Sequence, residues 1–387
     1  MQNQRLPEDS VLKELEYRLK DDFTYASGRI IGSMCTIPHP LARKVYTRYL
    51  EKNIGDSGLF PAVDKLENET VTLIGELLSN PAASGHIVTG GTEANTLALW
   101  AARKLSKKKN GEVVVPASVH CSFDKAADML GLKIIKVRLN NRFQVDIDAV
   151  KDALNPKTIA IVGIAGTTGL GVVDPIDRLS EIASENSIYL HVDAAFGGFV
   201  LPFLKELGHS VPDFDFSLSG VRSITVDPHK MGLAPIPSGG ILFRDERLRK
   251  TLAFKISYLA GGETEQSTLA GTRSGASVIA VWTLMRHFGR DGYRETVKNC
   301  LQLTFDLAER IRKIHGLDVV REPTMNVIGI KSRELDIHRI ALELRLKKWA
   351  ISLFPHHIRV VIMPHVKRQH IDRFLQDLQS IVDKIKS

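Results

Sequence analysis

The chain has 387 residues, of which 43% are hydrophobic and 25% are charged, and this is the composition of a folded globular protein. At roughly 150 residues per domain, the length predicts two or three domains, or one large α/β domain with an appendage, and excludes a single small module. The formal net charge is +8, from 52 basic and 44 acidic residues, but no aromatic-rich basic stripe accompanies it. We therefore expect no nucleic-acid partner.

Three cysteines, Cys35, Cys121 and Cys300, lie far apart and lack the spacing of a disulfide framework or a zinc site. We therefore expect a reducing, cytoplasmic environment and no bound metal. The amino terminus is highly charged, and no run of about 18 uncharged apolar residues follows it. The sequence predicts neither a signal peptide nor a membrane partner.

The chain begins with an expected arm, in which residues 10–20 have the apolar spacing of a short amphipathic helix and Gly- and Pro-rich loops follow at 28–40 and 55–61. From residue 64 onward, helical patterns alternate with strands. The expected strands carry the sequences EVVV, KIIKVRL, IAIVGIA, SIYLHVD, SITV and GGILFR. This alternation favours a mostly parallel sheet with helices on both faces, whose ligands bind at the carboxyl ends of the strands.

The pattern changes after an ambiguous stretch at residues 248–275. Residues 277–288 and 295–315 predict two helices, and the strand-like runs NVIGIKS and IRVVIMP are each followed by a helix. We expect three parts, namely an arm with substrate loops at 1–60, a large domain at 61–309 and a small α+β domain at 310–387.

Polar residues follow the expected strands of the large domain where each strand ends. They are His120, the GTTGLG segment that contains Thr168, Asp193, and the pair His229 and Lys230. Each one alone has an ordinary explanation, such as a packed histidine, a turn, a helix cap or a solvated lysine. At the carboxyl ends of one sheet, however, we expect them to converge on one crevice.

The cofactor pyridoxal phosphate (PLP) would use each kind of group in this crevice. A lysine can form an imine with its aldehyde, and a buried carboxylate can keep its ring nitrogen protonated. The TGGT segment, with Gly91 and Thr92, offers the backbone N–H groups of a helix terminus to its phosphate. Nucleotide binding is the weaker alternative, because the Gly-rich segments match neither a P-loop nor GxGxxG.

The motifs TGGTEAN, VHCSFDKAADMLG, GTTGLGVVD, HVDAAFGGF and DPHKMG resemble those of the group II PLP-dependent amino-acid decarboxylases, most closely the archaeal L-tyrosine/L-aspartate decarboxylases. The resemblance runs from about Asp22 to the end of the chain, and the combination of DPHK with HVDAA is its specific part. It implies an α/β protein of PLP fold type I, with a large, mostly parallel sheet flanked by helices and a small C-terminal α+β domain. It also implies a homodimer that releases CO2 from an L-amino acid.

The resemblance implies a role for each matching residue. Lys230 would bind the cofactor covalently, and Asp193 would pair with the ring nitrogen. His120, a catalytic residue, and Ala195 would cover the two faces of the ring, while Thr168 would contact its oxygen edge. The phosphate would be bound by Gly91, Thr92 and His229.

Three further candidates lie outside these strand ends. Related decarboxylases use a loop tyrosine as proton donor, which implies this role for Tyr258 on a mobile loop at 254–275, although a packing role is equally open. By the same resemblance, Thr272 would reach the phosphate of the other subunit. Arg359, at the start of a strand, is our candidate for binding the substrate carboxylate, or else it forms an ordinary salt bridge.

The sequence leaves the substrate open, because the loops at 35–39 and 58–62 favour neither an aspartate nor a tyrosine side chain. The archaeal relatives imply tyramine for methanofuran biosynthesis or β-alanine for coenzyme A biosynthesis. The alternatives are a glutamate decarboxylase, a sphingosine-phosphate-lyase-like or cysteine-desulfurase-like enzyme, and a non-catalytic protein that binds an anionic partner. A desulfurase is disfavoured because Cys300 lies on an expected helix.

Overall fold

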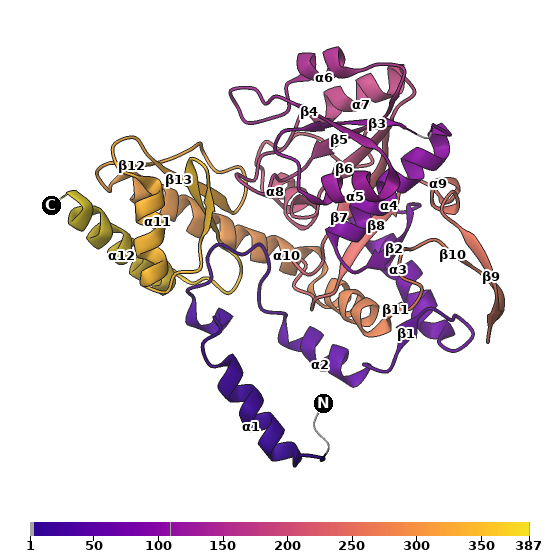
Figure 1. Cartoon of the computed structure of the whole chain (residues 1–387), viewed down its shortest axis with the longest axis horizontal. Helices are drawn as coiled ribbons and strands as arrows, with labels where there is room; N and C mark the ends of the chain where they lie inside the picture. Colours follow the sequence, from indigo (N-terminus) through magenta and orange to yellow (C-terminus); the bar gives the residue numbers. More distant parts are fainter. Residues whose placement is uncertain (1–3, 109, 387) are drawn as a thin grey trace.

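The computed structural model describes residues 4–108 and 110–386, and a seven-stranded sheet lies at its centre (Figure 1). The strands of this sheet are β2 (Ser84–Val88), β3 (Glu112–Pro116), β4 (Lys133–Val137), β5 (Thr158–Ile164), β6 (Tyr189–Asp193), β7 (Val221–Val226) and β8 (Gly239–Phe243). Their spatial order is β2-β8-β7-β6-β5-β3-β4. Strands β4, β3, β5, β6 and β7 pair in parallel, whereas β8 pairs antiparallel with both β7 and β2. The expected mostly parallel sheet is confirmed.

Helices surround this sheet and continue into the carboxyl-terminal part of the chain (Figure 1). They are α1 (Glu8–Leu19), α2 (Pro40–Arg48), α3 (Pro61–Leu77), α4 (Gly91–Ser106), α5 (Ser122–Leu130), α6 (Ile147–Ala153), α7 (Ile176–Glu185), α8 (Leu201–Glu206), α9 (Glu246–Lys250), α10 (Gly275–Arg312), α11 (Ile337–Leu346) and α12 (Arg368–Lys386). Two short 3-10 helices, Tyr25–Ser27 and Gly197–Phe199, complete the helical elements of the described residues.

Both faces of the central sheet are covered, and β3 illustrates the reason. Val113 and Val115 belong to a hydrophobic core shared with α4 and α5, whereas Val114 belongs to the core shared with α3, α7 and α8. Successive side chains of a strand point to opposite faces, so a strand with a core on each side has to be apolar throughout. This accounts for the uninterrupted run of valines.

A second, smaller sheet forms the expected C-terminal α+β domain. Its strands are β12 (Leu317–Val319), β13 (Val327–Ser332), β14 (Ser352–Phe354) and β15 (His357–Val361), in the antiparallel order β12-β13-β15-β14. Helices α11 and α12 and the end of α10 share a separate hydrophobic core with this sheet. The two helices expected at 277–288 and 295–315 are the halves of α10, which is broken at Gly289, where φ is 54°.

The stretch 248–275, whose pattern was ambiguous and which includes the loop expected at 254–275, forms defined elements. It contains α9 and the hairpin of β9 (Phe254–Leu259) and β10 (Gly262–Gln266), and it ends in β11 (Arg273–Ser274), which pairs with β1 (Asn53–Ile54). The hairpin is exposed on both faces, so it lacks the alternation of apolar and polar residues by which a strand is predicted. Its base rests on the body of the protein, where the ring of Phe254 stacks on that of Trp100.

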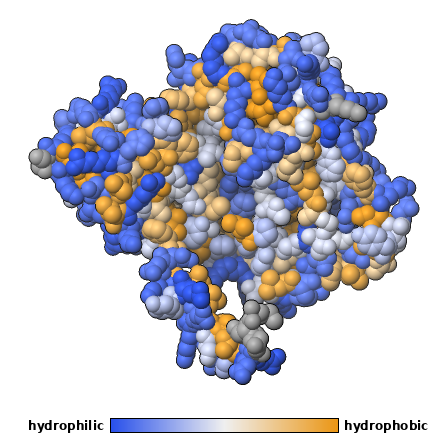
Figure 2. Space-filling view, in the orientation of Figure 1, coloured by the Kyte–Doolittle hydropathy of each residue, from blue (hydrophilic) through white to orange (hydrophobic). Residues whose placement is uncertain are grey.

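Helix α1 projects from the rest of the molecule and has no buried residue (Figures 1 and 2). Its hydrophobic side chains Val11, Leu12 and Leu15 are each about half exposed, at 46%, 48% and 49%. The amphipathic helix expected at 10–20 is therefore present without a partner surface in the described chain. No helix in the described part of the chain is long and apolar enough to cross a membrane.

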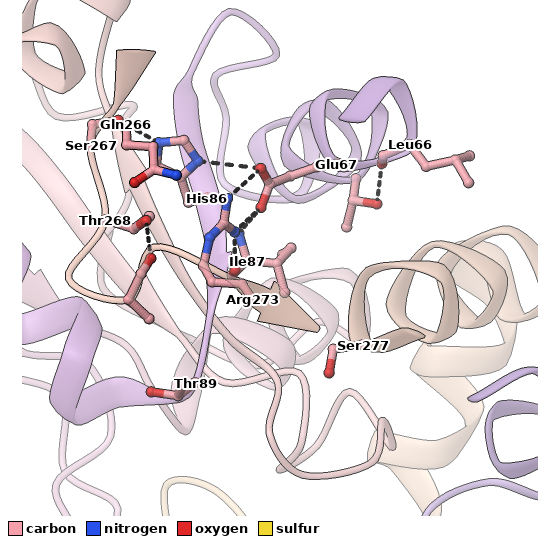
Figure 3. Close-up of polar contacts among 12 residues, drawn as sticks. Leu66, Glu67, His86, Ile87, Thr89, Gln266, Ser267, Thr268, Arg273 and Ser277 are labelled. Carbon is pink, nitrogen blue, oxygen red and sulfur yellow. Dashed lines mark hydrogen bonds and ion pairs between the residues drawn. The ribbon is translucent and has the colours of Figure 1, made fainter. Parts of the chain in front are cut away.

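A buried ion pair ties α3 to the end of β2 and to β11 (Figure 3). Arg273 donates hydrogen bonds to both carboxylate oxygens of Glu67 and to the carbonyl of Ile87, and His86 contacts Glu67 Oε2 at 3.3 Å. The side chains of Glu67 and Arg273 are only 5% and 9% exposed. Burial opposes the charge of Glu67, but Arg273 and His86 outweigh it and hold the pKa of this carboxyl below its ordinary value.

Removal of the Glu67 carboxylate would leave the guanidinium of Arg273 buried without its counter-ion. We expect Glu67→Ala to lower the free energy of unfolding by about 3 kcal/mol or more, as measured by denaturant unfolding. The control is Glu14→Ala, which breaks an exposed pair with Arg18 and should change this free energy by less than about 0.5 kcal/mol. Equal stability of the two variants would show that the buried pair contributes nothing.

Candidate active site

A pocket of about 390 Å³ lies at the carboxyl ends of the central strands. Eight of the residues predicted for the site line it, namely Gly91, Thr92, His120, Thr168, Asp193, Ala195, His229 and Lys230. A larger pocket of about 530 Å³ lies beside the Glu67–Arg273 pair and contains none of these eight. The chemistry expected from the sequence therefore belongs to the smaller pocket.

The topology of the sheet explains why these residues meet. Asp193 is the last residue of β6, Thr168 follows β5, His120 follows β3 and Lys230 follows β7. Parallel strands end at the same edge of a sheet, and loops at that edge form the ligand crevice of open α/β sheets. Strand β2 runs in the same direction as β7, because each is antiparallel to β8. Helix α4 begins at Gly91, just after the end of β2, so Gly91 lies at the same edge of the sheet.

Asp193 is a buried carboxylate that is attracted by the ammonium of Lys230. The backbone N–H of Ala195 donates to its Oδ1 at 3.1 Å, and the amide of Asn95 donates to its Oδ2 at 3.1 Å. Burial raises the pKa of Asp193, and the ammonium of Lys230 opposes this effect only in part. A charged Asp193 is therefore favoured by a further cation in the pocket, such as a protonated ring nitrogen.

Lys230 is attracted by two buried acids, Asp227 and Asp193. Its Nζ is 2.8 Å from Oδ2 of Asp227, which is 2% exposed. Burial lowers the pKa of Lys230, but Asp227 and Asp193 outweigh it, so the pKa lies above its ordinary value. In the absence of another reactant the lysine is therefore held as an ammonium ion.

Glycines leave room for an anion at the amino terminus of α4. A Cβ added to Gly91 would lie 3.0 Å from Oδ2 of Asp227, and one added to Gly239 would lie 2.3 Å from Cα of Gly90. Glu93 accepts hydrogen bonds from the backbone N–H and the hydroxyl of Thr89, at 2.9 and 2.7 Å, which fixes the turn before the helix. The first N–H groups of a helix have no partner within it and bind phosphate well. The phosphate of PLP fits this position.

A chain of hydrogen bonds links His120 to Asp193. The hydroxyl of Ser122 lies 3.0 Å from Nδ1 of His120 and accepts a bond from the Asn95 amide at 2.9 Å, and the same amide reaches Asp193. His120 itself is exposed to the pocket, so its ring is free to cover a flat ligand. The sequence interpretation missed Asn95 and Ser122, although Asn95 lies one helical turn after Gly91 and so shares its face of α4.

Sequence interpretation also gave no role to Asp227, although it stands three residues before Lys230 in the DPHK motif. His229 packs on Gly90, and its Nε2 lies 3.7 Å from Oδ2 of Asp227. Burial lowers the pKa of His229, so the ring is favoured as a neutral donor at the phosphate position.

Three predicted residues do not line this pocket in the described chain. Tyr258 is 85% exposed on the β9–β10 hairpin. Thr272 lies beside Gly55, near the larger pocket. Arg359 is 8% exposed and donates to the carbonyls of Thr168 and Gly32. It forms no salt bridge within the described residues, and its bond to Thr168 keeps it next to the pocket.

Comparison with known sequences identifies the family. Residues 35–333 match the family described as the pyridoxal-dependent decarboxylase conserved domain. The L-aspartate/L-glutamate decarboxylase of Pyrococcus horikoshii is 49% identical over 377 residues, which are 97% of this chain and 98% of that protein. A probable L-tyrosine/L-aspartate decarboxylase of Methanothermobacter thermautotrophicus is 48% identical over 360 residues, which are 92% of this chain and 98% of that protein.

Solved structures agree with this match. A sphingosine-1-phosphate lyase of Burkholderia pseudomallei superposes with a TM-score of 0.92 at 30% identity and covers 100% of this chain and 93% of its own. The glutamate decarboxylase of Lactobacillus brevis superposes with a TM-score of 0.92 at 25% identity and covers 100% and 95%. The chain therefore belongs to the pyridoxal-dependent decarboxylase family and is a PLP-dependent amino-acid decarboxylase.

Proposed function

We propose that this decarboxylase converts L-aspartate to β-alanine and CO2, with L-tyrosine, which would give tyramine, as the second candidate substrate. Relatives that are 48–49% identical over nearly the whole chain bear the names of aspartate, aspartate/glutamate and tyrosine/aspartate decarboxylases. β-Alanine would serve coenzyme A biosynthesis, and tyramine would serve methanofuran biosynthesis.

The observation that carries the proposal is the position of Lys230, whose ammonium group is attracted by both Asp193 and Asp227 in one pocket. We assign Lys230 to covalent attachment of the cofactor and Asp193 to its ring nitrogen. Ala195 and His120 would lie against the two faces of the ring, and Thr168 would lie at its oxygen edge. Gly91, Thr92 and His229 would hold the phosphate.

PLP, when bound, links to the amine of the substrate and accepts the electron pair that remains when CO2 leaves. Asp193 contributes by keeping the ring nitrogen protonated, because an ion pair in a buried site raises the affinity of the nitrogen for its proton. The bonds from Ala195 and Asn95 hold the carboxylate in one orientation for this purpose. Asp193 is thus the group that makes the cofactor an effective electron acceptor.

Arg359 remains our candidate for binding the substrate carboxylate. Its guanidinium is buried beside the pocket, donates to Thr168 at 2.8 Å and to Ser352 at 2.9 Å, and has an Nε without an acceptor in the described chain. Burial lowers the pKa of Arg359 to about 10, which is still far enough above neutral pH to keep its charge. A buried cation with an unused donor is suited to an incoming carboxylate.

We propose a homodimer in which each subunit completes the site of the other. Three features support it: the exposed apolar face of α1, with Leu12 and Leu15 about half exposed, the 85% exposure of Tyr258, and the position of Thr272 away from the pocket of its own chain. In such a dimer, Tyr258 would supply the proton that replaces CO2 in the partner's site. Thr272 would contact the phosphate bound by the partner.

We retain the division into residues 1–60, 61–309 and 310–387 as a proposal. Its second boundary is supported by α10, because Leu301 packs into the core of the large domain and Leu307 into that of the small one. We also propose that the protein acts in the cytoplasm, where its three cysteines, all free thiols, would stay reduced.

The proposed reaction predicts release of CO2 from a defined amino acid. We expect the purified holoenzyme, incubated separately with L-aspartate, L-glutamate and L-tyrosine, to release CO2 and the matching amine fastest with L-aspartate. Product analysis by chromatography measures each amine. Fastest release from glutamate or tyrosine would overturn the choice of aspartate, and no release from any of the three would overturn the substrate class.

The proposed role of Tyr258 predicts complementation between two variants that are each defective in amine formation. We expect Tyr258→Phe to lower the yield of amine and to increase decarboxylation-dependent transamination, because the proton donor is lost. Lys230→Ala should be inactive. If Tyr258 serves the partner subunit, dimers re-formed from an equal mixture of the two variants should recover about a quarter of the wild-type rate. No recovery would mean that Tyr258 acts within its own chain or has no role.

A further inference from the structure

The protonation of Lys230 conflicts with the covalent attachment of the cofactor, which is the reaction that we assign to this lysine. An ammonium group has no lone pair, so it cannot attack an aldehyde, and an amine nucleophile needs either a lowered pKa or a nearby base. Here Asp227 and Asp193 hold the proton on Lys230. A group in the pocket that can take this proton would therefore speed cofactor loading at neutral pH.

Asp227 is in direct contact with that proton. Its Oδ2 is 2.8 Å from Nζ of Lys230, within the distance for proton transfer. Its Oδ1 is buried and accepts no hydrogen bond from the described part of the chain. A Cβ on Gly91 would lie 3.0 Å from Oδ2 and 3.5 Å from Oδ1, so the carboxylate also borders the space assigned to the cofactor.

Other ionisable groups face Asp227 from the surrounding segments and are less suited to this role. Asp193, on β6, acts on it only through its charge and is already engaged by Ala195 and Asn95. The thiol of Cys35 is favoured in its neutral form, because burial raises its pKa. His229 contacts Oδ2 only at 3.7 Å. Asp227 is the base that has both the contact with Nζ and an unused oxygen.

We propose that Asp227 is a catalytic acid–base group for the covalent exchange of the cofactor at Lys230. This inference rests on the proposed role of Lys230 and adds a role for a residue that neither the relatives nor the sequence motifs assign. Asp227 takes a proton from the ammonium group, which gives Lys230 its nucleophilic amine. It then returns the proton to the oxygen that leaves the aldehyde.

The atoms balance in this sequence of steps. The ammonium gives one proton to Oδ2 of Asp227 and becomes an amine. The lone pair of this amine forms a bond with the aldehyde carbon. A second nitrogen proton moves to the former carbonyl oxygen, and Asp227 returns the first proton to the same oxygen, which departs as water. One proton remains on the nitrogen, Asp227 is a carboxylate again, and the net charge is unchanged.

The test is the rate at which apoenzyme takes up PLP, followed by the visible absorbance of the covalent adduct in stopped-flow experiments. We expect Asp227→Asn to slow this rate by about 100-fold or more at pH 7.5. The wild-type rate should change little between pH 7.5 and 9, since the proton stays within the pair. The variant rate should rise steeply with pH, because its lysine has to lose the proton to water.

Two further variants separate catalysis from structure. Asp227→Ala should be slow, and formate should restore its loading rate in a saturable way, whereas chloride at the same ionic strength should not. Asp213→Asn is the matched control, because it removes an exposed Asp–Lys pair, with Lys205 at 2.6 Å, and it should load at the wild-type rate. Circular dichroism spectra identify any variant that does not fold. If Asp227→Asn does not fold, formate rescue of Asp227→Ala tests the role of Asp227 in its place.

The outcomes distinguish this inference from the function on which it rests. If wild-type protein forms no visible adduct, the proposed role of Lys230 fails. If wild-type protein forms the adduct, and Asp227→Asn loads at the same rate or faster with the same pH profile, only the role of Asp227 fails. Absence of formate rescue in a folded Asp227→Ala protein would also contradict it.

Discussion

The attraction of the Lys230 ammonium to the buried carboxylates of Asp193 and Asp227 is the interaction on which the site depends. Buried charges are costly unless they are paired, so each of these groups requires the others in the unloaded protein. The same arrangement favours a ligand that brings its own cation to Asp193, and Lys230 can bind the electrophile of that ligand once it has lost its proton. PLP, the cofactor of the family, has both.

The topology of the central sheet brings these groups together. Five parallel strands and β2 end at one edge of the sheet, so residues from distant parts of the sequence meet there. Small residues then set how close the segments come, since a side chain at Gly91 would contact Asp227 and one at Gly239 would collide with Gly90. The reactive groups are thus held at one edge of the central sheet, whereas Tyr258 lies on an exposed hairpin.

The parallel sheet, the small domain and most of the pocket residues were predictable because strand periodicity, strand-end position and Gly-rich turns are local features of the sequence. Ala195 was implied only by the family resemblance. Asp227 and Asn95 were missed because their importance depends on contacts with Lys230 and Asp193 that spacing alone does not reveal. The β9–β10 hairpin was missed because both of its faces are exposed. The family match removes the alternative of a non-catalytic binding protein. Tyr258 and Thr272 do not line the pocket of the described chain, and their proposed roles depend on the proposed homodimer.

Chemical trapping of the cofactor tests the central claim most directly. Holoenzyme would be reduced with borohydride, which fixes an imine irreversibly, and then digested and analysed by peptide mass spectrometry. The attraction of Lys230 to Asp193 and Asp227 in the predicted cofactor pocket predicts that the phosphopyridoxyl group is found on the peptide that contains Lys230. Stable labelling of a different lysine, with Lys230 unmodified, would contradict the assignment of the whole site.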